Sequence, residues 1–202
     1  MGERAFQALY QQSPRVPGGR LFQVAHIPVT DVPLDGPAVR AWDLAASPTG
    51  DWTAGVKLVR GAGGWQVADV QRVRGGPEDV VQAILRTVRD DGKLVTVGLP
   101  QDPGQAGRAQ VAFLTHALSG WRVQSGPETG AKATRAMPVA SQANAGTLSL
   151  LRGAWNRAFL DEMQDFPGGR WDVQVDALSR AFSMLLDVPT PARMARVEWG
   201  RR

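Results

Sequence analysis

Three strand-like stretches stand close together in the first half of the chain, and their spacing most limits what it can fold into. They cover residues 39–46, 52–60 and 65–72 and are separated by turn-forming residues at 47–50 and 61–64. Short strands joined by turns rich in Pro and Gly indicate an antiparallel meander. The chain is therefore expected to build a sheet in which consecutive strands pair.

Helices and strands alternate after the meander. Apolar residues recur at helical spacing from Pro77 to Asp91, and Gly92 stops the pattern. Further expected elements are a buried strand at 93–99, a helix at 107–118, a strand at 121–125, a helix at 132–144 with a break at Pro138, a short strand at 147–151, and helices at 154–164 and 172–186. This order predicts an α/β fold.

The chain has 202 residues, enough for one substantial core, and we expect one domain over residues 36–188. Residues 1–35 are rich in Pro and Gly and predict an extended lead-in that is not packed. Residues 189–202 form a basic tail, for which a solvated end is one interpretation and a contact with DNA or a partner the other.

Composition narrows the chemistry. The net charge of +4 and the pI near 10.3 favour contact with polyanions. Cysteine is absent, which excludes disulfides, thiolate metal sites and cysteine nucleophiles. The glycine-rich stretches lack an ATP-binding loop pattern, and no long apolar run indicates a signal peptide or membrane span. We expect a soluble intracellular protein whose metal ligands, where present, are oxygen or histidine.

Four aspartates occupy positions that solvation alone explains poorly. Asp43 lies inside the first expected strand, and Asp102 follows the buried strand at 93–99. Asp172 and Asp176 lie one turn apart on the last helix. Because each like-charge pair at 4 Å costs about 4 kcal/mol at an effective dielectric of 20, a cluster of these carboxylates requires a cation. Oxygen ligands favour Mg²⁺ or Mn²⁺, and two such ions suit phosphodiester hydrolysis.

Each candidate also has a structural explanation. A strand aspartate can bond to backbone or arginine, Asp102 can belong to a turn, and Asp172 can cap the last helix. Lys132 and Arg135 follow a glycine-containing loop and either hold a phosphate or lie on a solvated turn. Four tryptophans fall in or beside expected strands and are predicted to be core residues: Trp42, Trp52, Trp65 and Trp121.

Several stretches resemble the large terminase subunit of tailed phages, in the same order and over nearly the whole chain. They are 6–14 with 18–22 (FQALYQQSP, GGRLF), 40–45 (RAWDLA), Asp69-Val70 with Arg72, Arg74 and Pro77, 97–104 (VGLPQDPG), 132–136 (KATRA) and 166–179 (FPGGRWDVQVDALS). The second acidic position, often Glu in the family, is Asp102 here. Val173 stands where the family commonly has a second adjacent aspartate, so Asp172 and Asp176 both stay candidates for the third ligand.

The resemblance implies the C-terminal nuclease domain of such a subunit, with a ribonuclease H-like fold: a mixed central sheet with helices on both faces. It implies an endonuclease that cuts concatemeric viral double-stranded DNA in the host cytoplasm during genome packaging. Asp43, Asp102, Asp172 and Asp176 would bind Mg²⁺ or Mn²⁺ as catalytic residues, and Lys132 with Arg135 would bind DNA. Asp51 is a peripheral candidate. Expected partners are the terminase ATPase domain, the small terminase subunit and the portal protein, without a membrane.

Two alternatives stay open at this point. Another ribonuclease H-like nuclease, such as a Holliday-junction resolvase or ribonuclease H, would use a similar site. Ribonuclease H usually adds a glutamate within the first helix, where this chain has only Glu78 near the start. A non-catalytic module that docks DNA or the portal would use the basic surface alone.

Overall fold

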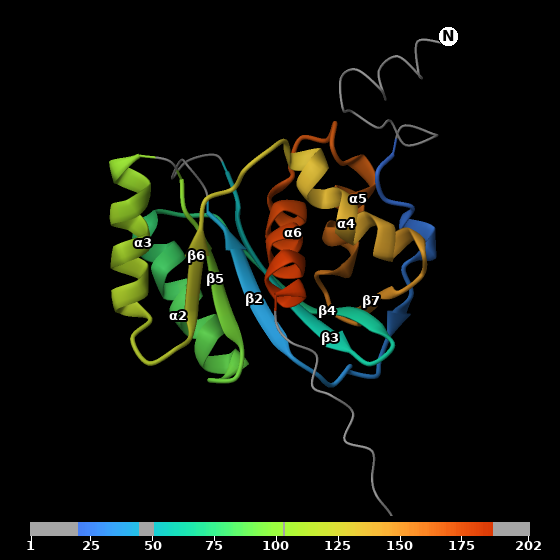
Figure 1. The fold of residues 1–202 in the computed structure, drawn as a ribbon, viewed down its shortest axis with the longest axis horizontal. Helices are drawn as coiled ribbons and strands as arrows, with labels where there is room; N and C mark the ends of the chain where they lie inside the picture. Colours follow the sequence, from blue (N-terminus) through green and yellow to red (C-terminus); the bar gives the residue numbers. More distant parts are fainter. Residues whose placement is uncertain (1–19, 45–50, 103, 188–202) are drawn as a thin grey trace, which may run out of the picture.

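A seven-stranded mixed sheet forms the centre of the molecule in the computed structural model, which describes residues 20–44, 51–102 and 104–187 (Figure 1). The strand order is β1-β7-β4-β3-β2-β5-β6. Their bounds are β1 Val29–Thr30, β2 Ala38–Asp43, β3 Thr53–Gly61, β4 Gly64–Val73, β5 Thr96–Pro100, β6 Val123–Gly126 and β7 Leu148–Leu151.

Strand directions determine which residues meet at one edge of the sheet. β2, β3 and β4 pair antiparallel, as predicted for a meander, while β5 pairs parallel with β2 and β6 pairs parallel with β5. On the other side, β7 pairs parallel with β4 and β1 pairs parallel with β7. The carboxyl ends of β2, β5 and β6 therefore lie side by side.

Helices cover both faces of the sheet, which confirms the predicted fold class. α4 (Lys132–Asn144), α5 (Asn156–Asp165) and α6 (Val173–Leu186) pack on one face, around Ala41 and Val56 among others. α2 (Pro77–Asp91) and α3 (Gln105–Ala117) pack on the other, around Trp42 and Leu99 (Figure 1). No helix in the described ranges is long and apolar enough to span a bilayer.

The last helix lies at the centre of the first face. α6 packs against β2 and β3 and is buried along most of its length, including Val175, Leu178 and Leu185. Gly98 in β5 makes room for it, because a Cβ there would lie 2.4 Å from the sulfur of Met184. The sheet and α6 are therefore in close contact beside the strands that end at the common edge.

Several predictions made from local patterns are corrected. β2 ends at Asp43, so this aspartate is terminal rather than mid-strand, and β5 begins at Thr96 instead of residue 93. α4 runs through Pro138 without the expected break. The carbonyl of Thr134, which loses its partner at Pro138, belongs to an exposed residue that water can reach.

The expectation of an unpacked lead-in is wrong for residues 20–35. Leu21, Phe22 and Ile27 are buried in the core, and β1 joins the sheet. These three apolar side chains, spaced among turn residues, help to anchor the segment. Trp42 and Trp65 are buried as predicted. Trp52 and Trp121 are only partly buried; Trp52 stacks against two arginines and Trp121 against one lysine. The basic tail at 189–202 lies outside the described residues, and the assignment of 1–35 to a link with another domain stays a prediction.

Candidate active site

Asp43 ends β2 on the face covered by α6, since it lies two residues after Ala41 on the same face of the strand and Ala41 is buried in that core. Burial, together with the negative charges of Asp176 and Glu128, raises the pKa of its carboxyl from 3.8 to about 7. The positive charges of Lys132 and Arg180 act in the opposite direction. Asp43 therefore belongs to a compact set of charges contributed by the sheet, two helices and a loop.

Asp176 lies in the first turn of α6 and is almost completely buried, with 2% of its side chain exposed. It forms ion pairs with Lys132 Nζ at 2.7 Å and with Arg135 Nη2 at 3.0 Å, both from the first turn of α4. A buried carboxylate is stable only when it is paired, so these two cations compensate its charge.

Asp172 occupies the N-cap position of α6, and its carboxylate also contacts Lys132 Nζ, at 2.8 Å. Burial lowers the pKa of Lys132, but its hydrogen bonds to Asp172 and Asp176 outweigh that effect and raise the pKa above its ordinary value. Lys132 thus bridges the two aspartates of the last helix. Its ammonium group is fully protonated at neutral pH.

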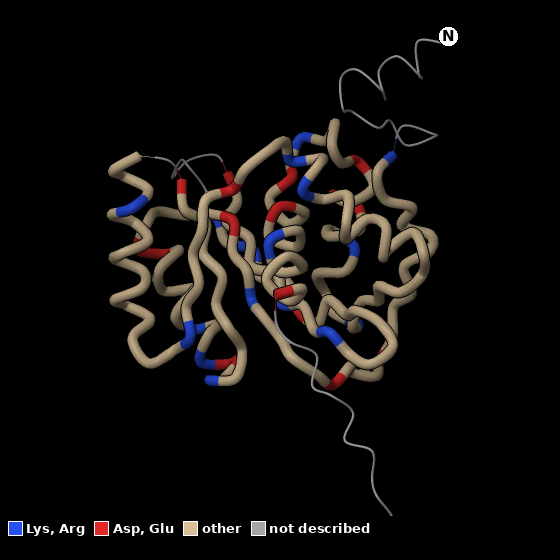
Figure 2. The backbone as a smooth tube through the Cα atoms, viewed as in Figure 1, with Lys and Arg blue, Asp and Glu red and all other residues tan. Residues whose placement is uncertain are grey.

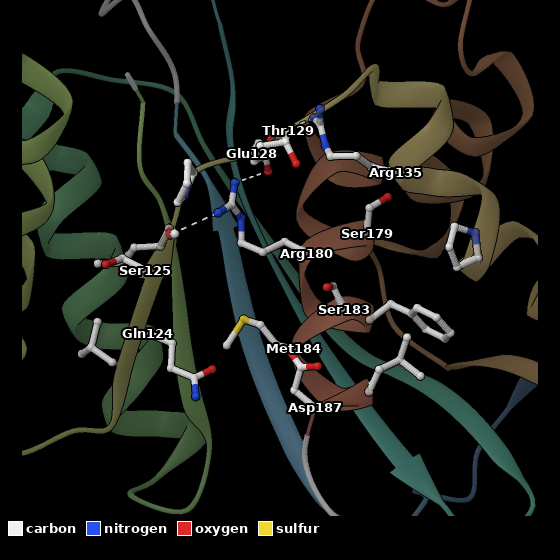
Figure 3. A pocket seen from close by; sticks show the side chains of 17 residues that line it. Gln124, Ser125, Glu128, Thr129, Arg135, Ser179, Arg180, Ser183, Met184 and Asp187 are labelled. Carbon is white, nitrogen blue, oxygen red and sulfur yellow. Dashed lines mark hydrogen bonds and ion pairs between the residues drawn. The ribbon is translucent and has the colours of Figure 1, made fainter. Parts of the chain in front are cut away.

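Two participants were not selected from the sequence, Glu128 and Arg180. Glu128 follows β6 and pairs with Arg135 at 2.7 Å and with Arg180 (Figure 3). Arg180 lies one turn beyond Asp176 on α6, and its Nη1 donates to the carbonyl of Leu99 in β5 at 3.1 Å. The sequence signal that could have identified Glu128 is its position after the third parallel strand. The signal that could have identified Arg180 is its spacing of four residues from Asp176.

Asp102 lies outside this network. It follows β5 at the expected edge but is exposed, and it is not among the charges with the largest effect on Asp43. Asp51, the peripheral candidate, is exposed just before β3. Across the described ranges, no three acidic or histidine side chains lie close enough together to hold one metal ion. The structure therefore brings Asp43, Asp172 and Asp176 to one locality with Lys132 and Arg135, and leaves Asp102 apart from them.

The chemistry of these side chains suits a hard divalent cation. The anionic groups are carboxylates only, which favours Mg²⁺ or Mn²⁺ over softer metals. Basic and acidic segments lie close together along the edge where β2 and β6 end and α4 and α6 begin (Figure 2). Positive side chains here neutralise the acidic ones, and a bound cation would serve the same purpose.

A cleft of about 800 Å³ opens beside these charges, between β6 and α6. Gln124 and Ser125 line one wall, and Ser179, Arg180 and Ser183 line the other (Figure 3). Glu128 and Arg135 lie at the end of this cleft nearest the aspartates. The cleft therefore reaches Glu128, Arg135 and Arg180 of the charged set.

Comparison with known proteins gives a consistent picture. A family model described as the terminase RNase H-like domain matches residues 40–185. No curated protein matches the chain. The P22 large terminase nuclease domain is similar in structure, with a TM-score of 0.61 and 16% identity, covering 84% of this chain and 93% of the other.

Two further solved structures were obtained with metals. The large terminase nuclease of thermophilic phage G20c with bound magnesium has a TM-score of 0.58 and 15% identity, covering 81% of this chain and 96% of that one. The Mn-soaked human cytomegalovirus terminase nuclease domain has a TM-score of 0.58 and 13% identity, covering 74% and 83%. With most of its length matched by the family model, this chain belongs to the terminase RNase H-like domain family.

Proposed function

We propose that this chain is a Mg²⁺- or Mn²⁺-dependent endonuclease that hydrolyses phosphodiester bonds of double-stranded DNA and cuts concatemeric viral DNA during genome packaging. The observation that carries this proposal is that Asp43 at the end of β2 lies close enough to Asp176 at the start of α6 for the charge of Asp176 to add to burial in raising the pKa of Asp43. Such convergence of carboxylates is unfavourable unless a cation is also bound.

Asp43, Asp176 and Asp172 would hold the ions, and Asp102 would join from the loop after β5. The ions, when bound, supply an acidified water and neutralise charge on the leaving oxygen. The basic residues then have a second use. Lys132 and Arg135 would leave their carboxylate partners and bind DNA phosphates, because a divalent cation replaces their charge at Asp172 and Asp176.

The metals in the related structures support the proposed cofactor, and family membership supports the proposed biological role. The nuclease would act in the host cytoplasm together with a terminase ATPase domain, a small terminase subunit and a portal protein. The alternatives, another ribonuclease H-like nuclease or a non-catalytic docking module, differ in substrate and in turnover, so one assay separates them.

The test uses supercoiled plasmid with Mn²⁺, with EDTA and with two substitutions. Wild-type protein should nick and linearise the plasmid with Mn²⁺ but not with EDTA, and Asp43→Asn should lower the rate at least about 100-fold. Asp90→Asn is the matched control, since Asp90 is an exposed carboxylate on α2 at the opposite face. Preference for a four-way junction or an RNA–DNA hybrid would indicate the other nucleases. A gel shift without cleavage would indicate a docking module.

A further inference from the structure

A ladder of alternating arginine and tryptophan side chains lies beside the candidate active site. We define the ladder as Arg72, Trp52, Arg74, Trp171 and Arg170. The guanidinium carbons of Arg72 and Arg74 lie 4.2 and 4.6 Å from the ring centroid of Trp52. Those of Arg74 and Arg170 lie 5.7 and 4.8 Å from the ring centroid of Trp171. All four distances are within the range of cation–π stacking.

The register of the sheet places the ladder next to Asp43. Asp43 pairs with Ala54 in β3, and Ala54 pairs with Arg72 in β4. Residues paired in this way point to the same face, so Arg72 lies roughly 10 Å from Asp43, two strand spacings away. At the other end, Trp171 immediately precedes Asp172, the N-cap residue of α6. The ladder therefore begins and ends within reach of the candidate metal ligands.

Two of the three arginines of the ladder are open to solvent. Arg74 and Arg170 are exposed, while Trp52, Trp171 and Arg72 are partly buried. Arg170 forms no ion pair with any described residue, so its charge is available to a ligand. Stacking on a ring fixes the plane of a guanidinium, which lowers the entropy lost when it binds a ligand.

We propose that this ladder is a DNA-backbone binding track, in which Arg74 and Arg170 bind successive phosphates of the duplex whose scissile bond lies at Asp43 and Asp176. Guanidinium groups match phosphate oxygens in a two-bond geometry. A row of three arginines beside a carboxylate site suits a polyanion that continues past the site. The inference rests on the proposed function, because it supplies a path for the same DNA.

The test measures binding of a fluorescent 30-base-pair duplex in EDTA, where metal-dependent cleavage cannot occur, across a salt titration. The double variant Arg74→Gln with Arg170→Gln should bind roughly 10-fold more weakly and lower the slope of log affinity against log salt by about 2, one per phosphate lost. The matched control carries Arg89→Gln and Arg122→Gln, two exposed arginines near the opposite edge of the sheet, and should bind like wild type.

A second variant separates stacking from charge. Trp171→Leu keeps both arginines but removes the ring between them, so affinity should fall about 3-fold with the salt slope unchanged. In the plasmid assay the double variant should raise KM and leave kcat near wild type. Wild-type affinity and slope in the double variant, at an unchanged melting temperature, would overturn the track. That result is distinct from failure of the proposed function. The proposed function fails where the wild-type protein binds DNA without cutting it.

Discussion

The ammonium nitrogen of Lys132 lies 2.7 Å from Oδ2 of Asp176, a carboxylate with almost no exposed surface. The same nitrogen lies 2.8 Å from Asp172. Lys132 therefore occupies the position between two candidate metal ligands and supplies the positive charge that they need. A metal ion bound at these carboxylates would compete with Lys132, whose charge neutralises them in the metal-free protein.

Substitution of Lys132 by Gln should make the protein depend more strongly on metal. Without the ammonium group, Asp176 keeps only Arg135, and the metal-free protein should lose about 1–2 kcal/mol of unfolding free energy. Because Mn²⁺ would then bind without displacing a lysine, it should raise the melting temperature more in Lys132→Gln than in wild type. Lys93→Gln, which removes an exposed lysine stacked on Trp121, is the control. Equal Mn²⁺ shifts in all three proteins would contradict the competition.

Asp43 should make stability depend on pH. Its pKa is raised from 3.8 to about 7 by burial and by nearby carboxylates. Because the folded state binds the proton more tightly, the stabilisation is complete below about pH 4 and is lost as pH rises to 7. The Asp43→Asn variant does not lose this stabilisation, because its amide does not ionise. In EDTA it should be more stable than wild type at pH 8 by on the order of 2 kcal/mol, since solvent screens part of the shift. Urea unfolding of both proteins at pH 4 and pH 8 measures the difference, which should vanish at pH 4.

Glu162 should be replaceable by glutamine but not by alanine. Its buried carboxylate accepts hydrogen bonds from the backbone N–H groups of Gln174 and Val175, at 2.6 and 3.1 Å, in the first turn of α6. Alanine would leave these donors unpaired and cost about 2–4 kcal/mol.

Glutamine keeps one acceptor oxygen for the backbone. The amide nitrogen of the side chain introduced by Glu162→Gln can donate to Oε1 of Gln174 after the Gln174 amide rotates by half a turn. This Oε1 is a buried atom without a partner in the described structure. The cost should be about 1 kcal/mol. Thermal unfolding of Glu162→Ala and Glu162→Gln would show the difference, and equal losses would argue against this capping role.

Arg40 should matter for folding and not for cleavage. It lies on the α2 face of β2 with 1% exposure, and it binds Asp91 at 2.5 Å and Asp69 at 2.7 Å. Arg40→Met would leave Asp91 with Lys57 alone and should cost about 3–5 kcal/mol. Plasmid cleavage measured well below the melting temperature should stay within 2-fold of wild type, roughly 0.4 kcal/mol. A large loss of activity in folded protein would show that the two faces of the sheet are coupled.

Local sequence patterns predicted the helices and strands well, because the residues that begin and end each element lie next to it in the sequence. The turn residues at 61–64 separate β3 from β4, and Pro77 and Gly92 bound α2 as expected. Asp176 was found because it lies one helical turn from Asp172 and next to Val175 and Ala177, near the apolar face of the last helix. Local patterns did not place Asp176 beside Lys132 and Arg135. Only the resemblance to a family connected these three residues.

Other parts of the site depend on how distant elements pack, which no local pattern records. Glu128 becomes a partner of Arg180 only because β6 pairs with β5 and α6 crosses the sheet beside them. Asp102 has the right sequence position, yet its side chain is exposed beyond the network. The packing of Leu21 and Phe22 was missed because Pro and Gly dominate the surrounding composition.

α6 is at once the most buried helix and the one that carries Asp176. During synthesis on a ribosome, the sheet strands from β2 to β7 emerge before it does. The two ends of the candidate metal site can meet only after Leu186 has left the exit tunnel and the helix has docked. On the proposed function, a nascent chain would therefore be unable to cut DNA at any earlier stage, and completion of the core and onset of activity would coincide.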